Sequence, residues 1–128
     1  MIGPKAPKLT PAQEKRAYLV ATERDQGRCV RCGHPGPVER DHRQNRDAWN
    51  TVPSNLQCLG GPFGCGCHLW KTEHPEEATL AGFAVPRWAR PELWPAWRVD
   101  VGWVLYDDDG GWQSITETTA HLLMKGET

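Results

Sequence analysis

Apolar and polar residues near the start of the chain follow a helical pattern. A helix is expected to begin at Thr10-Pro11, because threonine caps helix N-termini and proline suits the first helical position. Gly27 is expected to end this helix, since glycine commonly follows the last helical residue. The apolar face of the predicted helix comprises Ala17, Tyr18, Val20 and Ala21.

After this helix the pattern changes to short strands and further helices. Two short runs with the residue types of β-strands are separated by a polar loop, which is typical of neighbouring strands. Aspartate and glycine residues between two later β-forming runs indicate a hairpin turn. We therefore predict an α+β fold. The expected elements are strands at residues 38–42 and 55–59, helices opening at Cys67 and Pro75, a hairpin of residues 101–106 and 112–115, and a helix at residues 116–124.

Length and composition limit the chain to one modest domain. It has 128 residues, 11 prolines, 13 glycines and a mean hydropathy of −0.64, which is typical of a loop-rich globular protein. Residues 1–9 are expected to form a flexible tail, and residues 10–128 a single domain. No apolar run approaches the roughly 20 residues that span a bilayer, and the N-terminus lacks a secretory signal. We therefore expect a cytoplasmic protein without a membrane partner, whose thiols stay reduced.

Charge is distributed unevenly along the chain. Residues 1–71 hold eleven Lys and Arg against six Asp and Glu, whereas residues 72–128 hold four against ten. The basic half contains the cysteines, and it is the half expected to face a phosphate backbone. A zinc ion bound by four thiolates would add a charge of about −2 to that half, which weakens the inference that this half binds phosphate. Ordinary solvated charges are the alternative interpretation.

Five cysteines, an odd number, favour metal binding over disulfides in a reducing compartment. Cys29 and Cys32 form a Cys-x2-Cys turn, and later cysteines can complete a tetrahedral structural zinc site with Cys67. The fourth ligand is either Cys65 or Cys58. We favour Cys65, because it makes a tight chelate with Cys67, whereas Cys58 can fill an inward strand position as a small hydrophobe.

Asp41, His42 and His68 form a second group with chemistry of its own. Hydrolysis of a phosphodiester needs a base to activate water and a Lewis acid to neutralise developing charge. A neutral imidazole suits the base near physiological pH. One carboxylate and one imidazole can hold a divalent ion and leave positions open for phosphate and water. Adjacent strand residues point to opposite faces, so Asp41 and His42 need a local bend to serve one phosphate.

The segments that carry these residues resemble the HNH endonuclease family, most closely the small HNH proteins of tailed phages of actinobacteria. The similarity covers about residues 22–112. It implies a small zinc-braced ββα-metal (HNH) core over residues 29–74, an N-terminal helix, and a C-terminal β-hairpin within an extension over residues 83–128. The segments that carry the similarity are Val38–Arg43, Ser54–Gln57, Gly66–Thr72, His74–Ala78, Phe83–Trp88 and Trp103–Tyr106.

The resemblance implies a role for each matching residue. His42 would be the general base, and Asn55 would orient the loop that carries it. Asp41 and His68 would hold a catalytic Mg²⁺, Mn²⁺ or similar ion, while a structural Zn²⁺ would brace the fold. This chain departs from the phage subgroup at two positions. The subgroup often has histidine where this chain has Asp41, and it has its third zinc-binding cysteine where this chain has Gly60. The expected phosphate contacts are Arg43, Arg46 and Lys71.

The predicted function is metal-dependent hydrolysis of DNA, by nicking or by double-strand cutting. The resemblance further implies a phage-encoded protein that assists terminase during DNA packaging, with terminase or portal proteins as partners. A mobile homing-type nuclease is the nearest alternative within the same enzyme class. From another class, the alternative is a non-catalytic zinc-binding module that binds DNA or a partner protein. That module does not account for the joint occurrence of the four predicted catalytic residues.

Overall fold

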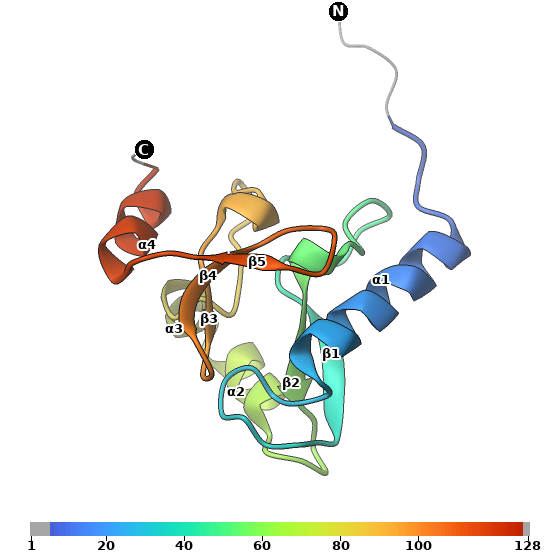
Figure 1. The fold of residues 1–128 in the computed structure, drawn as a ribbon, viewed down its shortest axis with the longest axis horizontal. Coiled ribbons are helices and arrows are strands. Elements are labelled where there is room, and N and C mark those ends of the chain that lie inside the picture. The colour runs from blue at the N-terminus through green and yellow to red at the C-terminus, as the bar shows by residue number, and fades with distance from the viewer. Residues whose placement is uncertain (1–5, 127–128) are drawn as a thin grey trace, which may run out of the picture.

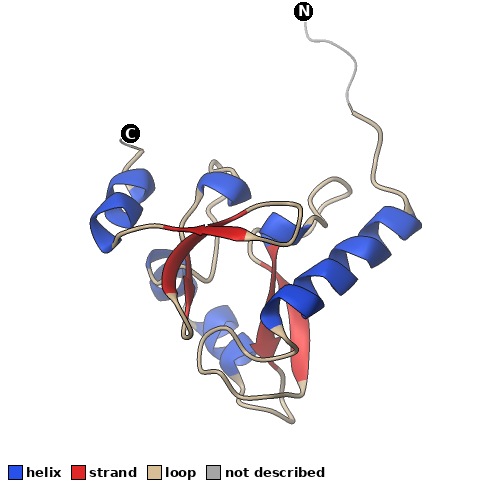
Figure 2. Cartoon of the chain, in the orientation of Figure 1, coloured by secondary structure: helices blue, strands red, loops and turns tan. Residues whose placement is uncertain are grey.

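Two small antiparallel sheets and four α-helices make up residues 6–126, the part of the chain that the computed structural model describes (Figure 1). One sheet has two strands and the other has three (Figure 2). The predicted α+β class is therefore confirmed. In chain order the elements are α1 (Pro11–Asp25), β1 (Val38–His42), β2 (Leu56–Gly60), α2 (Cys67–Glu73), α3 (Pro75–Leu80), β3 (Ala96–Arg98), β4 (Gly102–Tyr106), β5 (Trp112–Ser114) and α4 (Glu117–Met124), with 3₁₀ turns at Pro53–Asn55 and Pro91–Leu93.

Helix α1 begins where the sequence predicts. The Thr10 hydroxyl accepts a hydrogen bond from the backbone N–H of Gln13 at 3.1 Å, and the Gln13 side chain accepts one from the Thr10 N–H at 2.8 Å. These two bonds form a capping box, which satisfies backbone donors that the first turn leaves free. The helix ends at Asp25, and Gln26 adopts the left-handed cap conformation (φ 56°) one residue before Gly27.

Strands β1 and β2 form an antiparallel hairpin between two buried clusters. Their register pairs Asp41 with Gln57 and His42 with Leu56. Leu56 packs against α1, whereas Leu59 packs into a cluster that includes residues of α2 and α3. Because side chains alternate along a strand, the two faces of the hairpin carry different groups. Asp41 and Gln57 share a hydrogen bond on the face that meets α2.

The C-terminal segment folds into a three-stranded sheet in the order β3-β4-β5. The predicted hairpin is present as β4 and β5, with Val104 opposite Ser114. Strand β3 was missed, because three residues after a proline carry too short a pattern to interpret. Ala96 of β3 pairs with Val104, and both are buried together with Tyr106.

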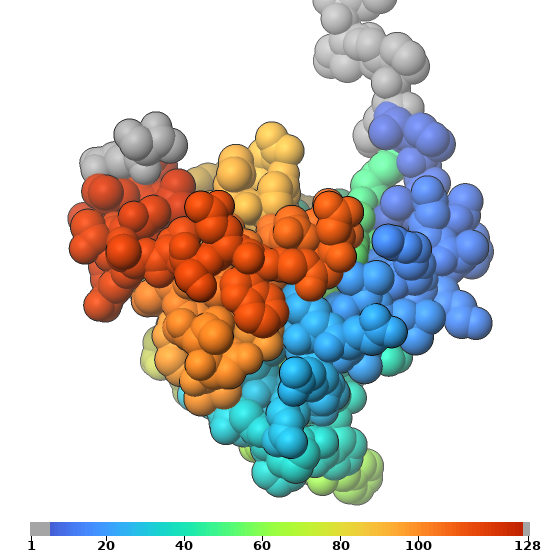
Figure 3. Space-filling view, in the orientation of Figure 1, coloured from blue at the N-terminus to red at the C-terminus, as the bar shows by residue number. Residues whose placement is uncertain are grey.

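Buried charged side chains hold the two sheets together. Asp25, the last residue of α1, forms ion pairs with Arg24 and with Arg98 of β3. Arg98 also donates a hydrogen bond to the Tyr106 hydroxyl of β4 at 3.2 Å. Figure 3 shows the C-terminal segment, in orange and red, packed directly against the segment around α1, in blue. Asp25 also accepts a hydrogen bond from the backbone N–H of Cys58, so this carboxylate connects the hairpin to the C-terminal sheet.

Residues 6–9 belong to the predicted tail, and two hydrogen bonds join them to the rest of the fold. The backbone N–H of Leu9 donates to the Ala48 carbonyl at 3.1 Å, and the indole N–H of Trp49 donates to the Ala6 carbonyl at 2.9 Å. These residues therefore lie along the loop that joins β1 to β2. The prediction for residues 1–5 falls outside the described residues. Across residues 6–126, no helix is both long enough and apolar enough to cross a membrane.

Candidate metal centre and adjoining cleft

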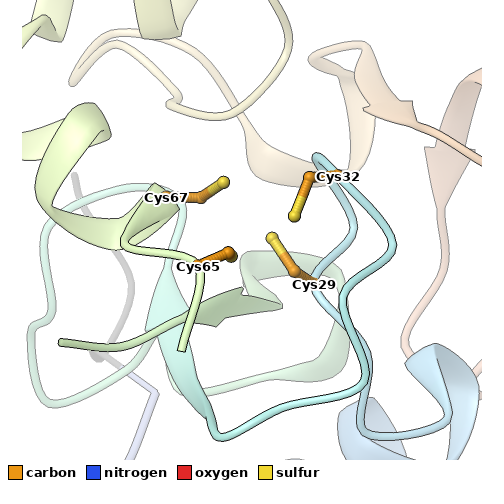
Figure 4. A group of neighbouring side chains, drawn as sticks. All are labelled: Cys29, Cys32, Cys65 and Cys67. Atoms are coloured by element: carbon orange, nitrogen blue, oxygen red, sulfur yellow. The ribbon is translucent and has the colours of Figure 1, made fainter. Parts of the chain in front are cut away.

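Four cysteines from two separate segments meet beside the hairpin. Cys29 and Cys32 lie in the turn after α1, Cys65 lies in the loop after β2, and Cys67 is the first residue of α2 (Figure 4). Their sulfur atoms all lie within 4.8 Å of one another, and Figure 4 shows the sulfur atoms of Cys29, Cys32 and Cys67 directed into the same space. Sulfur ligands of a tetrahedral zinc with bonds of about 2.3 Å lie about 3.8 Å apart. The four thiols can therefore hold a metal ion.

Gly60 leaves the space that Cys65 occupies. A Cβ atom built on Gly60 would lie 2.0 Å from Cys65 Sγ and 3.0 Å from the Cys65 backbone nitrogen. Non-bonded heavy atoms normally stay about 3.5–4.0 Å apart, so a side chain at position 60 would displace this sulfur. The thiol that the resemblance places at position 60 is thus supplied to the cluster by Cys65 of the following loop.

Cys58 lies apart from this cluster. It is fully buried in β2, and its backbone N–H donates to the Asp25 carboxylate at 3.0 Å on the side of the strand that faces α1. Burial raises the pKa of the Cys58 thiol to about 12. Its thiol is not among the four that meet in the cluster, so it serves as a small packing group. Cys65, the residue favoured from the sequence, is therefore the fourth member of the cluster.

A second polar group lies where β1 faces α2. Asp41 Oδ1 is 3.2 Å from His68 Nε2, and Glu39 Oε1 is 3.2 Å from His68 Nδ1. A neutral imidazole has one N–H, so one of these contacts joins two acceptors unless a second proton or a cation lies between them. Neighbouring ligands of an octahedral ion with bonds of about 2.1 Å lie about 3.0 Å apart. The 3.2 Å between Asp41 and His68 is the distance of a direct ion pair and is also close to this ligand spacing.

Asp41 is buried and held from the side opposite His68. Its Oδ2 accepts hydrogen bonds from Lys71 Nζ at 2.7 Å and from Gln57 Nε2 at 3.0 Å. Lys71 also donates to the carbonyl of His42 at 2.9 Å. Lys71 was predicted to contact phosphate, but its ammonium group is engaged with Asp41 and the adjoining backbone. It therefore orients the carboxylate and leaves Oδ1 directed at His68.

His42 follows Asp41 at the end of β1 and is half-buried. Its Nε2 lies 2.9 Å from the hydroxyl of Thr51, and among the described residues its Nδ1 has no hydrogen-bond partner. Burial is the largest influence on this imidazole and lowers the pKa of His42, while the nearby Asp41 carboxylate opposes that shift in part. The neutral form of His42 is therefore favoured at pH 7.

Asn55 is fully buried and joins the two arms of the loop between β1 and β2. Its Oδ1 accepts from the Gln44 N–H at 2.8 Å, and its Nδ2 donates to the carbonyls of Gln44 at 3.1 Å and Asn50 at 3.0 Å. Gln44 lies just after His42, and Asn50 lies just before Thr51. Asn55 therefore links the backbone next to His42 with the backbone next to Thr51.

The side chains of this second group open into a cleft of about 580 Å³ beside α2. Asp41, His42 and His68 all line it. Five of the twelve other lining residues are basic, including Arg46, an exposed residue of the loop after β1. A cleft that combines a carboxylate, two imidazoles and several cations suits an anionic substrate together with a divalent ion.

Arg43 was predicted to contact phosphate, but it is buried inside the protein. Its guanidinium is buried, with 1% of the residue exposed, and donates to the carbonyls of Ser54, Pro91 and Trp94 at 2.8, 3.0 and 2.9 Å. This burial lowers the pKa of Arg43 to about 10. The chain leaves the strand after His42, which directs the next side chain into the protein. Arg43 therefore ties the loop to the C-terminal segment and is not available to DNA.

Sequence analysis missed three polar residues of the site: Glu39, Thr51 and Gln57. Alternation along β1 places Glu39 on the face of Asp41, and this signal was available from the sequence. Gln57 lies directly opposite Asp41 in the hairpin, which depends on a register that the sequence did not define. Thr51 reaches His42 only through the path of the intervening loop, so no local pattern indicates it.

Helix α2 connects the two groups. Cys67 and His68 are consecutive residues in its first turn, and Cys67 points into the thiol cluster while His68 faces Asp41. A metal ion held by the cysteines would therefore fix the start of the helix that presents His68.

No protein family, curated protein or solved structure matches this chain.

Proposed function

We propose that this protein is a metal-dependent DNA endonuclease of the HNH (ββα-metal) type. The proposal rests on one placement: Asp41 and His68 face each other at 3.2 Å, and His42 opens into the same cleft. A hairpin followed by a helix supplies these residues, in the order that the resemblance implies. A base and a cation site on one basic cleft are the parts that phosphodiester hydrolysis requires.

In this proposal His42 is the general base. Thr51 engages Nε2, which leaves Nδ1 to accept a proton from the attacking water. Because burial lowers the pKa of His42, its imidazole is neutral and can take up a proton at pH 7. Asn55 holds both arms of the loop and thereby keeps His42 beside Thr51.

Asp41 and His68 would hold a divalent ion such as Mg²⁺ or Mn²⁺. An ion bound there supplies Lewis-acid stabilisation of the charge that develops on the phosphate and on the leaving oxygen. Lys71 and Gln57 orient the Asp41 carboxylate through Oδ2. Glu39 contacts Nδ1 of His68 and orients its ring, as carboxylates commonly do behind metal-binding histidines.

We assign the four-cysteine cluster to a structural zinc ion, because thiolates suit zinc better than they suit hard ions such as Mg²⁺. Arg40, Arg46 and Arg87 line the cleft, and we assign them to contacts with the DNA backbone. From the resemblance alone, we add that the protein is phage-encoded and assists terminase, with a terminase or portal protein as its partner.

Cleavage of supercoiled plasmid tests this proposal. Zinc-loaded protein is incubated with plasmid in Mg²⁺, Mn²⁺ or EDTA, and nicked and linear products are quantified. We expect conversion with a divalent ion and none in EDTA. His42→Ala should slow cleavage by about 10²–10⁴-fold, the usual contribution of a general base. His121→Ala is the matched control, because His121 lies on α4 with 53% of its side chain exposed and does not line the cleft.

The outcome separates catalysis from binding. If the protein carries zinc but leaves the plasmid intact with every ion, the nuclease proposal is wrong. Retention of DNA binding in that experiment would identify a zinc-containing binding module instead. Equal loss of cleavage in the His42 and His121 variants would remove the assignment of His42 as the base.

A further inference from the structure

Arg31 links the two halves of the cysteine cluster. It lies within the turn that runs from Cys29 to Cys32, and its Nη1 donates a hydrogen bond to Cys67 Sγ at 3.4 Å. The carbon of its guanidinium group also lies 3.7 Å from the centre of the Trp70 ring. One cation thus extends from the first pair of cysteines to the helix that carries Cys67.

The aromatic surface beneath Arg31 is itself fixed. Trp70 stacks on His74 with ring centres 5.6 Å apart, and it meets Phe83 edge-on at 6.1 Å. The guanidinium therefore rests on a ring that contacts two other rings. Among the described residues, Arg31 is the only charged side chain that hydrogen-bonds to a sulfur of the four-cysteine cluster.

We propose that Arg31 is an outer-sphere partner of the metal centre, and that it retards release of the metal by donating a hydrogen bond to the Cys67 thiolate. A zinc ion with four thiolates carries a charge of about −2, which a neighbouring cation offsets. A hydrogen bond and a positive charge beside the sulfur stabilise its negatively charged, metal-bound form and so slow its departure from the ion. The inference rests on the zinc site of the proposed function and is independent of DNA cleavage.

Zinc release into excess chelator, followed with a chromogenic indicator, tests this role. Arg31→Met keeps an apolar stem over Trp70 but removes the charge and the N–H donor. We expect it to release zinc about 10-fold faster than wild type, within the range of outer-sphere losses. Arg31→Lys keeps the charge and should restore part of the retention. If the role of Arg31 were only to pack on Trp70, Arg31→Met would retain zinc at least as well as Arg31→Lys.

Arg28→Met is the matched control. Arg28 lies next to Cys29, but its Nη1 contacts the Gly33 carbonyl at 3.4 Å and no sulfur. The control therefore removes the same charge near the same turn without removing a donor to a thiolate. We expect zinc release within about 2-fold of wild type, because exposed charges act weakly through water.

Cobalt substitution provides a second readout that requires no enzymatic activity. The sulfur-to-Co²⁺ charge-transfer band should move to lower energy in Arg31→Met, because the sulfur lone pairs lose an N–H donor, and it should stay unchanged in Arg28→Met. If zinc release and this band in Arg31→Met both match wild type, the proposed role of Arg31 is wrong, but the proposed zinc site is not affected. A wild-type protein that binds no zinc overturns both. Arg31→Lys allows the same measurements if Arg31→Met fails to fold.

Discussion

Replacing Gly60 with alanine tests how the cysteine cluster is built. The new methyl group would lie 2.0 Å from Cys65 Sγ, against a normal contact of about 3.7 Å. The sulfur would have to move by about 1.7 Å, which is most of a Zn–S bond of about 2.3 Å. The backbone of Gly60 lies outside the left-handed region, so alanine meets no obstacle other than Cys65.

The size of the effect follows from the loss of one ligand in four. Structural zinc binding in small domains is worth about 10–16 kcal/mol, so one ligand contributes roughly 3 kcal/mol, or about 100-fold in affinity. We expect Gly60→Ala to bind zinc about 100-fold more weakly than wild type and to match Cys65→Ala. Gly111→Ala is the control, because the nearest atom to its new methyl group belongs to Asp107, at 3.0 Å, and not to the cluster.

Moving the cysteine provides the complementary test. In the double variant Gly60→Cys, Cys65→Ala, the thiol moves to the position where the resemblance expects it, and the space taken by the Cys65 sulfur becomes free. Competition with a chelator of known affinity measures zinc binding in each variant. We expect the double variant to recover at least 10-fold of the lost affinity. Wild-type zinc affinity in Gly60→Ala would refute the reasoning.

Two further predictions concern the cleft and its support. Arg43→Met should lower the free energy of unfolding by about 3 kcal/mol in denaturant titrations, because buried carbonyls lose their donor. Arg46→Met should change the free energy of unfolding by no more than about 0.5 kcal/mol, because Arg46 is exposed, but it should weaken DNA binding. Cleavage should rise with pH and level off below about pH 6.5, because His42 must be neutral and its pKa lies below the ordinary value of 6.5. Intact DNA affinity in Arg46→Met, or a plateau only above about pH 7.5, would contradict these predictions.

The dependence of the cleft on the thiol cluster follows from helix α2. Cys67 and His68 are adjacent, so the first turn of α2 takes part in both groups. Seven residues make a helix too short to be stable alone, which makes its position sensitive to what holds its first residue. In the proposed function, removal of zinc therefore impairs presentation of His68 although zinc takes no part in the reaction.

Local chemistry explains which elements were predictable. The start of α1 followed from Thr10 and Pro11, and β1 was predicted with its observed bounds because five residues carried a strand pattern between turns. Strand β2 begins one residue later than expected, because Pro53–Asn55 form a 3₁₀ turn. Strand β3 has three residues, so its existence depends on pairing with β4 more than on its own composition.

The sequence by itself determined which functional groups are present and their order: thiols suited to a soft metal, and a carboxylate with imidazoles suited to a divalent ion. Only the tertiary structure decided that Cys65 joins the cluster while Cys58 does not, that Arg43 turns inward, and that Glu39 and Thr51 reach the histidines. The reason is physical. Residue type and order belong to the chain, whereas the direction of a side chain at a strand end or in a loop depends on what packs against it.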